Sequence, residues 1–159
     1  MKILNDYEKG YIEGTLDGEG CLTIYRIKRS NNHYGYYLNV SWVNTKIEFL
    51  EKIKEILGSS SKIYNHNYGK GNRNPTYLLR LTSNEIPNIL NQINLVIKEE
   101  QRKILLEATP LIIHGKLKTV IELRRNNEEK LRELYLKLRS LNIKGRKNIK
   151  SIEMGNIST

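Results

Sequence analysis

The sequence lacks the marks of several large protein classes. It contains one cysteine, Cys21, among 159 residues, so no disulfide can form within the chain. No apolar run is long enough to cross a bilayer, and no charged segment followed by an apolar one predicts a secretory leader. The three histidines do not have the spacing of metal ligands, and no glycine loop of the nucleotide-binding kind is present. We therefore expect an intracellular protein of a reducing compartment.

Acidic residues are also scarce. The chain has 27 lysines and arginines against 17 aspartates and glutamates, which gives a formal net charge of +10. A field of that sign favours an anionic polymer or an anionic membrane surface as the partner. The length and a hydrophobic fraction of 38% suit one domain with its own core, expected over residues 1–144. A basic, flexible tail is expected over residues 145–159.

Capping signals predict where the helices begin and end. Asn5 and Glu8 have the spacing of a capping box, which begins a helix near residue 6 that glycines at 18 and 20 end. Thr45 and Glu48 have the same spacing and predict a helix that Gly58 ends. The remaining helices are predicted from residue 83 or 84, over 95–114, and over 117–141.

Alternating apolar and polar residues predict two hairpins. Strands over 21–29 and 36–43 flank one turn, and arms over 62–66 and 76–81 flank a turn rich in glycine and asparagine. The residues of the second strand that are expected to face the core are Leu38, Val40 and Trp42. The element order is therefore αββαββα followed by further helix, which predicts an α+β fold with helices on one face of an antiparallel sheet.

The other face of that sheet is expected to stay open. Hydroxyls, amides and cations predominate among its outward residues, and these groups read base edges and hold phosphates. The predicted nucleic-acid contacts, with those of the two turns, are Thr23, Tyr25, Lys28, Arg29, Asn31, Asn32, His33, Tyr37, Asn39, Ser41, Lys62, Tyr64, His66, Arg73, Thr76 and Arg80.

The first predicted helix carries a stripe of glycines. Gly10, Gly14 and Gly18 are four residues apart, so one side of the helix has no side chains and another backbone can approach closely. Asp17 and Glu19 follow at its end, and two acids at such a seam in a basic protein suggest a divalent metal and a phosphodiester. The alternatives are a stripe that packs on the chain's own core, a Glu19 that is only a turn acid, and an Asp17 that binds backbone.

Three segments resemble the LAGLIDADG homing endonucleases. Residues 12–20 (IEGTLDGEG) are similar to the nine-residue motif of that family. Residues 43–58 (VNTKIEFLEKIKEILG) are similar to its segment from the second strand into the next helix, and residues 95–106 (LVIKEEQRKILL) to the segment with its catalytic-centre lysine. The αββαββα order agrees with the fold of this family.

The resemblance implies a homodimer on double-stranded DNA, because family members with one motif copy pair through the motif helix. The interface would then include Gly10, Gly14, Asp17 and Gly18. A strand of about 10 residues spans roughly 33 Å, or about 10 base pairs, so two sheets would cover on the order of 20 base pairs. Because the two subunits of such a dimer are related by two-fold symmetry, the DNA site is expected to be pseudo-palindromic.

The resemblance also implies a site for double-strand cleavage. Glu19 aligns with the metal-binding acid, and the Gly18 carbonyl adds a ligand for Mg²⁺, for which Mn²⁺ or Ca²⁺ could substitute. Lys98 is expected to stabilise charge on the phosphate, and Asn44 to position water where the family usually has glutamine. Cleavage across the minor groove would leave short 3′ overhangs.

The sequence departs from the family pattern at several positions. Glu19 replaces the commoner aspartate, Asn44 is shorter than glutamine, and Glu13 and Thr15 stand where apolar residues are usual. A non-cleaving nucleic-acid binding protein of the same fold, such as an intron maturase or a regulator, is therefore the alternative. The expected partners are DNA and a second copy, with no membrane and no small-molecule cofactor. The expected location is a prokaryotic (archaeal) cytoplasm or an organelle.

Overall fold

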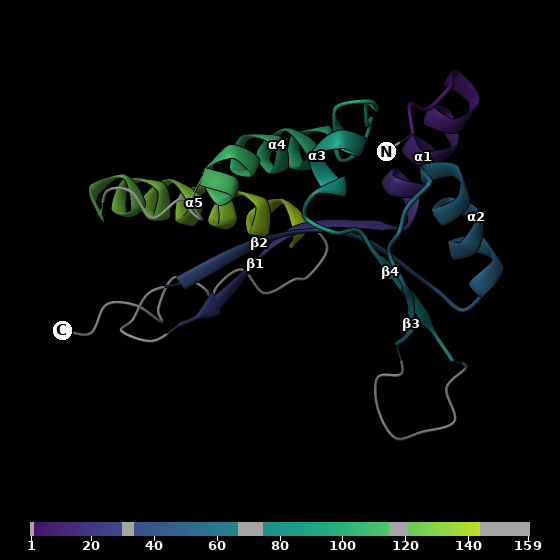
Figure 1. Cartoon of the computed structure of the whole chain (residues 1–159), viewed down its shortest axis with the longest axis horizontal. Helices are drawn as coiled ribbons and strands as arrows, with labels where there is room; N and C mark the ends of the chain where they lie inside the picture. Colours follow the sequence, from purple (N-terminus) through teal and green to yellow (C-terminus); the bar gives the residue numbers. More distant parts are fainter. Residues whose placement is uncertain (1, 30–33, 67–74, 115–120, 144–159) are drawn as a thin grey trace.

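The computed structural model describes residues 2–29, 34–66, 75–114 and 121–143 (Figure 1). The predicted α+β class and the αββαββα order are confirmed. In chain order the elements are α1 (Asp6–Gly18), β1 (Gly20–Lys28), β2 (Tyr34–Asn44), α2 (Ile47–Leu57), β3 (Ile63–Asn65), β4 (Tyr77–Arg80), α3 (Glu85–Leu90), α4 (Glu99–His114) and α5 (Ile121–Asn142). The expected contacts Asn31, Asn32, His33 and Arg73, and the tail over 145–159, lie outside the described residues.

The four strands form one antiparallel sheet in the order β1-β2-β4-β3. Within it, β1 pairs with β2 from Gly20 opposite Trp42 to Lys28 opposite Tyr34. β4 joins the two hairpins, because it pairs with β2 on one side and with β3 on the other. Helices α3, α4 and α5 lie along one side of the long β1–β2 hairpin (Figure 1). The described chain leaves the opposite side of the sheet without a helix.

Helix α1 begins and ends for local reasons. The Asn5 side chain accepts a hydrogen bond from the Glu8 amide at 2.9 Å, and the Glu8 carboxylate accepts one from the Asn5 amide at 3.0 Å, so the predicted capping box is confirmed. Glu19 is the C-cap residue. A Cβ at Gly20 would lie 2.8 Å from the Leu16 Cα and carbonyl oxygen, so only glycine fits where the chain turns into β1.

Helix α2 starts differently from the prediction. Lys46 is its N-cap residue and makes no side-chain capping bond, so the box of Thr45 and Glu48 was wrong. The Asn44 side chain instead accepts a hydrogen bond from the Lys46 amide at 2.9 Å, which is a local turn that asparagine favours. The helix ends at Gly58 as predicted, with φ of 57° in the left-handed region.

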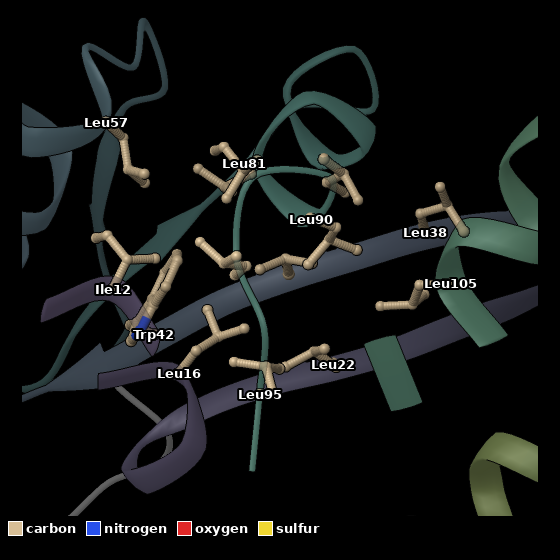
Figure 2. Packing of buried hydrophobic residues seen from close by; sticks show 14 of the residues in the cluster. Ile12, Leu16, Leu22, Leu38, Trp42, Leu57, Leu81, Leu90, Leu95 and Leu105 are labelled. Atoms are coloured by element: carbon tan, nitrogen blue, oxygen red, sulfur yellow. The ribbon is translucent and has the colours of Figure 1, made fainter. Parts of the chain in front are cut away.

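The core lies between the sheet and the helices. Figure 2 shows Trp42 of β2 in one cluster with Ile12 and Leu16 of α1, and all three side chains are fully buried. Leu38 and Val40 are also buried, which confirms the predicted inward face of β2. No described helix combines the length and the apolar character that a membrane span requires.

Candidate functional site

The open face of the sheet carries an exposed aromatic and aliphatic strip. Tyr25, Tyr37 and Tyr64 were predicted there and are exposed. Sequence reasoning missed Ile27 and Val43, which share this face by alternation and are also exposed. Every large exposed apolar side chain of the described strands therefore lies on the face that no described helix covers.

Lys28 is a correction to the predicted face. It pairs with Tyr34 and shares its side of β1 with Arg26, whose guanidinium lies over the rings of Tyr34 and Tyr135. Because Tyr135 belongs to α5, this is the side that the helices cover. Arg29 remains near the open face, where its guanidinium donates to the Tyr37 hydroxyl at 2.7 Å.

Two predicted contacts in the middle of the open face are buried. Asn39 is 0% exposed and Ser41 is 4% exposed, and the Asn39 amide donates to the Ser41 hydroxyl at 3.1 Å. The Arg80 guanidinium of β4 lies 5.4 Å from the Tyr25 ring of β1. These two strands flank β2, so the Arg80–Tyr25 pair spans the strand that carries Asn39.

The other predicted contacts lie in the short second hairpin. Lys62 is exposed, and the Thr76 hydroxyl donates to the His66 carbonyl at 2.6 Å. On β1, Thr23 pairs with Asn39 and belongs to the same open face.

The structure brings the three predicted catalytic residues to the C-terminal end of α1. Glu19 is exposed, and its carboxylate accepts a hydrogen bond from the Asn44 amide at 2.7 Å. The Lys98 ammonium donates to the carbonyls of Leu16 and Gly20, at 2.7 Å each. Burial lowers the pKa of Lys98 from its usual value, while the charge of Asp17 acts in the opposite direction.

Two acids of α1 bind the segment that precedes α4. Asp17 accepts hydrogen bonds from the amides of Val96 and Lys98, at 2.7 and 2.9 Å. Glu13 accepts one from the Asn94 amide at 2.8 Å. Burial alone would raise the pKa of Asp17, but the backbone N–H groups outweigh it and the pKa is lowered. These bonds hold residues 95–98 outside the helix, so α4 begins at Glu99 and the predicted start at residue 95 was wrong.

The glycine stripe faces open space. A Cβ placed at Gly10, Gly14 or Gly18 would meet nothing within 4 Å, so within the described chain the stripe does not pack on its own core. Tyr7 continues the stripe by one turn and is 75% exposed. Beyond the other end, Val96 is 91% exposed, although its backbone is bound to Asp17. Sequence reasoning missed both apolar residues.

The donor set at this end of α1 suits a hard cation only in part. Glu19 offers an exposed carboxylate, and Gly18 offers a nearby backbone carbonyl, which are oxygen ligands of the type that Mg²⁺ prefers. Among the described residues, no group of three or more histidines, cysteines or acids could hold a metal ion. One chain would therefore supply only part of a coordination shell for such an ion, and the rest would have to come from water, substrate or a second chain.

Comparison with protein families matches residues 6–94 to the LAGLIDADG-like domain. No curated protein sequence matches the chain. Several solved structures share its fold. I-CvuI, a homing endonuclease in complex with its target in the presence of Ca, is 16% identical with a TM-score of 0.68 over 86% of this chain and 85% of that one.

Two further structures are similar at comparable levels. The archaeal intron-encoded homing endonuclease I-Vdi141I, complexed with DNA, is 21% identical with a TM-score of 0.58 over 87% of this chain and 98% of that one. I-SmaMI, bound to cleaved DNA, is 18% identical with a TM-score of 0.60. That match covers 78% of this chain but 41% of the I-SmaMI chain, so one fold unit of the present kind accounts for less than half of it.

Proposed function

The chain belongs to the family of the LAGLIDADG-like domain, and from this premise we propose that it is a site-specific DNA endonuclease that acts as a homodimer with a divalent metal. The observation that carries the proposal is the end of α1. There the exposed carboxylate of Glu19 accepts a hydrogen bond from the side-chain amide of Asn44, 25 residues away in the chain. It directly follows the helix face on which the three glycines of the stripe leave no side chains.

The open face of the sheet supports DNA as the substrate. It combines exposed tyrosines, which pack and donate hydrogen bonds, with Arg80 and with apolar side chains that suit thymine methyl groups. β2 has 11 residues, so it spans about 36 Å, which is close to the length of 10 base pairs. Two sheets side by side would contact a site of about 20 base pairs.

A second copy of the chain is the proposed partner at the glycine stripe. The stripe and its apolar neighbours Tyr7, Val96 and Ile97 are exposed in the single chain, and a two-fold contact would bury all of them against their own copies. The partial match to I-SmaMI agrees with this proposal, because a chain of that length holds room for two such units.

The chemistry assigns different tasks to the residues at the end of α1. Glu19 and the Gly18 carbonyl would hold a divalent ion, which when bound supplies an activated water and neutralises charge at the scissile phosphate. Asn44 orients the carboxylate through its 2.7 Å bond before DNA arrives. An amide cannot accept a proton at neutral pH, so Asn44 serves as an orienting group and the proton leaves to solvent water.

Cleavage of a randomised DNA library tests the proposed activity. The protein is incubated with the library and Mg²⁺ or with a chelator, and cut molecules are sequenced to reveal the site. We expect double-strand cuts at one site of about 20 base pairs, lost with the chelator and lost in Glu19→Gln. Asp6→Asn removes an acid from the other end of the same helix and should leave cutting unchanged.

Two results would contradict the proposal. One is full cutting by Glu19→Gln, which would mean that this carboxylate does not hold the metal. The other is tight nucleic-acid binding without any metal-dependent cut, which would favour the non-cleaving alternative.

A further inference from the structure

Two contacts join α1 and the start of α4 in opposite directions. The Asp17 carboxylate, near the C-terminal end of α1, accepts hydrogen bonds from the backbone amides of Val96 and Lys98. The Lys98 ammonium, just before α4, donates to the backbone carbonyls of Leu16 and Gly20. Each side chain therefore satisfies backbone groups of the segment that carries the other. We refer to these four hydrogen bonds as the Asp17–Lys98 clasp.

The clasp ties together backbone groups beside the ends of two helices. Leu16 lies in the last turn of α1 and Gly20 begins β1, while Val96 and Lys98 directly precede α4. An acid suits the positive N-terminal end of α4, and a cation suits the negative C-terminal end of α1. The half-buried ammonium is placed where two carbonyls compensate for its lost hydration. The two interactions are therefore expected to depend on each other.

The two carbonyls that Lys98 binds lie close to Glu19 in the chain. Leu16 and Gly20 stand on either side of Glu19 in the chain, so one ammonium closes a five-residue segment around that acid. Lys98 has three N–H donors, and two of them are used within this segment. A lysine so engaged could stabilise charge on a phosphate directly only with its third donor or by releasing a carbonyl.

We propose that Asp17 and Lys98 act together as positioning residues that hold residues 16–20, and with them Glu19 and the Gly18 carbonyl, in the geometry that a metal requires. The proposal deepens the proposed endonuclease function and rests on it. It assigns Lys98 an action through Glu19, whereas the family resemblance implies direct stabilisation of the phosphate. Asp17, which touches no reacting atom, becomes as important as Lys98.

Metal titrations of cleavage separate the two roles of Lys98. The variants are Lys98→Met, Asp17→Asn and their combination, with Lys103→Met as the control, because Lys103 is an exposed lysine of α4, the helix that Lys98 directly precedes. We expect each single variant to raise the Mg²⁺ concentration for half-maximal cleavage by about ten- to a hundredfold, as for groups that orient metal ligands. The double variant should resemble the single ones, and DNA affinity without metal should not change.

Hydrogen exchange tests the clasp without any cleavage. In the protein alone, Lys98→Met and Asp17→Asn should both accelerate exchange of the amides of residues 18–20 and of 96 and 98, while Lys103→Met should not. This measurement remains decisive if the wild type proves not to cut DNA, so the clasp and the proposed activity fail separately.

The proposal is overturned by either of two results. In one, Lys98→Met slows cleavage at saturating Mg²⁺ with an unchanged metal midpoint and Asp17→Asn is neutral, which would assign Lys98 to the phosphate itself. In the other, the two variants leave amide exchange at residues 18–20 unchanged.

Discussion

Gly14→Ala should strengthen the single chain and weaken the dimer. A Cβ at Gly14 meets nothing within 4 Å among the described residues, and alanine is favoured over glycine inside a helix by about 1 kcal/mol. In a symmetric dimer the substitution adds one methyl group from each subunit to the interface. If each methyl group overpacks the interface at a cost of about 1–3 kcal/mol, the dimer dissociation constant rises by at least about 30-fold.

Sedimentation velocity over a concentration series measures the dissociation constant, and urea unfolding at concentrations below it measures the stability of the single chain. Gly20→Ala is the matched control, because its Cβ would lie 2.8 Å from the Leu16 backbone and should destabilise the chain itself. Equal dissociation constants for the wild type and Gly14→Ala would refute a seam at this glycine. A wild type that stays monomeric at all concentrations, with and without DNA, would refute the dimer altogether.

Acid should destabilise the chain through Glu85. Burial alone would raise its pKa, but hydrogen bonds from Thr82, Ser59 and Ser61 lower it from 4.5 to about 2. The stabilisation is complete above pH 4.5 and is lost as the pH falls towards 2, so the free energy of unfolding should drop by about 3 kcal/mol over that range. Urea unfolding at several pH values should show this slope in the wild type and a flatter one in Glu85→Gln; equal slopes would contradict the assignment. Arg80→Ala should weaken DNA binding and reduce the slope of log affinity against log salt by about 1, whereas Arg26→Ala, on the helix-covered face, should leave the slope unchanged.

The parts of the fold that follow from neighbouring residues could be predicted from the sequence. The capping box of Asn5 and Glu8 and the helix end at Gly58 were confirmed because such signals act within one helical turn. The inward face of β2 was confirmed because side chains alternate along any strand. The same alternation contained the information for Ile27, Val43 and Lys28, which were missed or assigned to the wrong face.

Two features that were wrong or missed involve contacts between distant segments. Residues 95–98 are not helical, although their sequence suits a helix, because Asp17 accepts hydrogen bonds from the amides of Val96 and Lys98 and Glu13 accepts one from the amide of the preceding Asn94. The role of Glu85 was not predicted, because all of its partners except Thr82 come from a loop about 25 residues away in the chain. Helix propensity and hydrophobic periodicity report on residues close together in the sequence, so they do not predict hydrogen bonds between distant segments.

The sequence alone was sufficient for the order of the elements, the basic character and the position of the glycine stripe, since each depends on residue type and short spacing. Only the tertiary structure decided that the stripe is left bare, that Asn44 contacts Glu19, and that Lys98 reaches carbonyls 78 and 82 residues away. Those facts depend on how α1, β2 and the start of α4 pack on a shared core. That packing is a property of the whole chain, because each contact forms only after the others have set the distance between the segments.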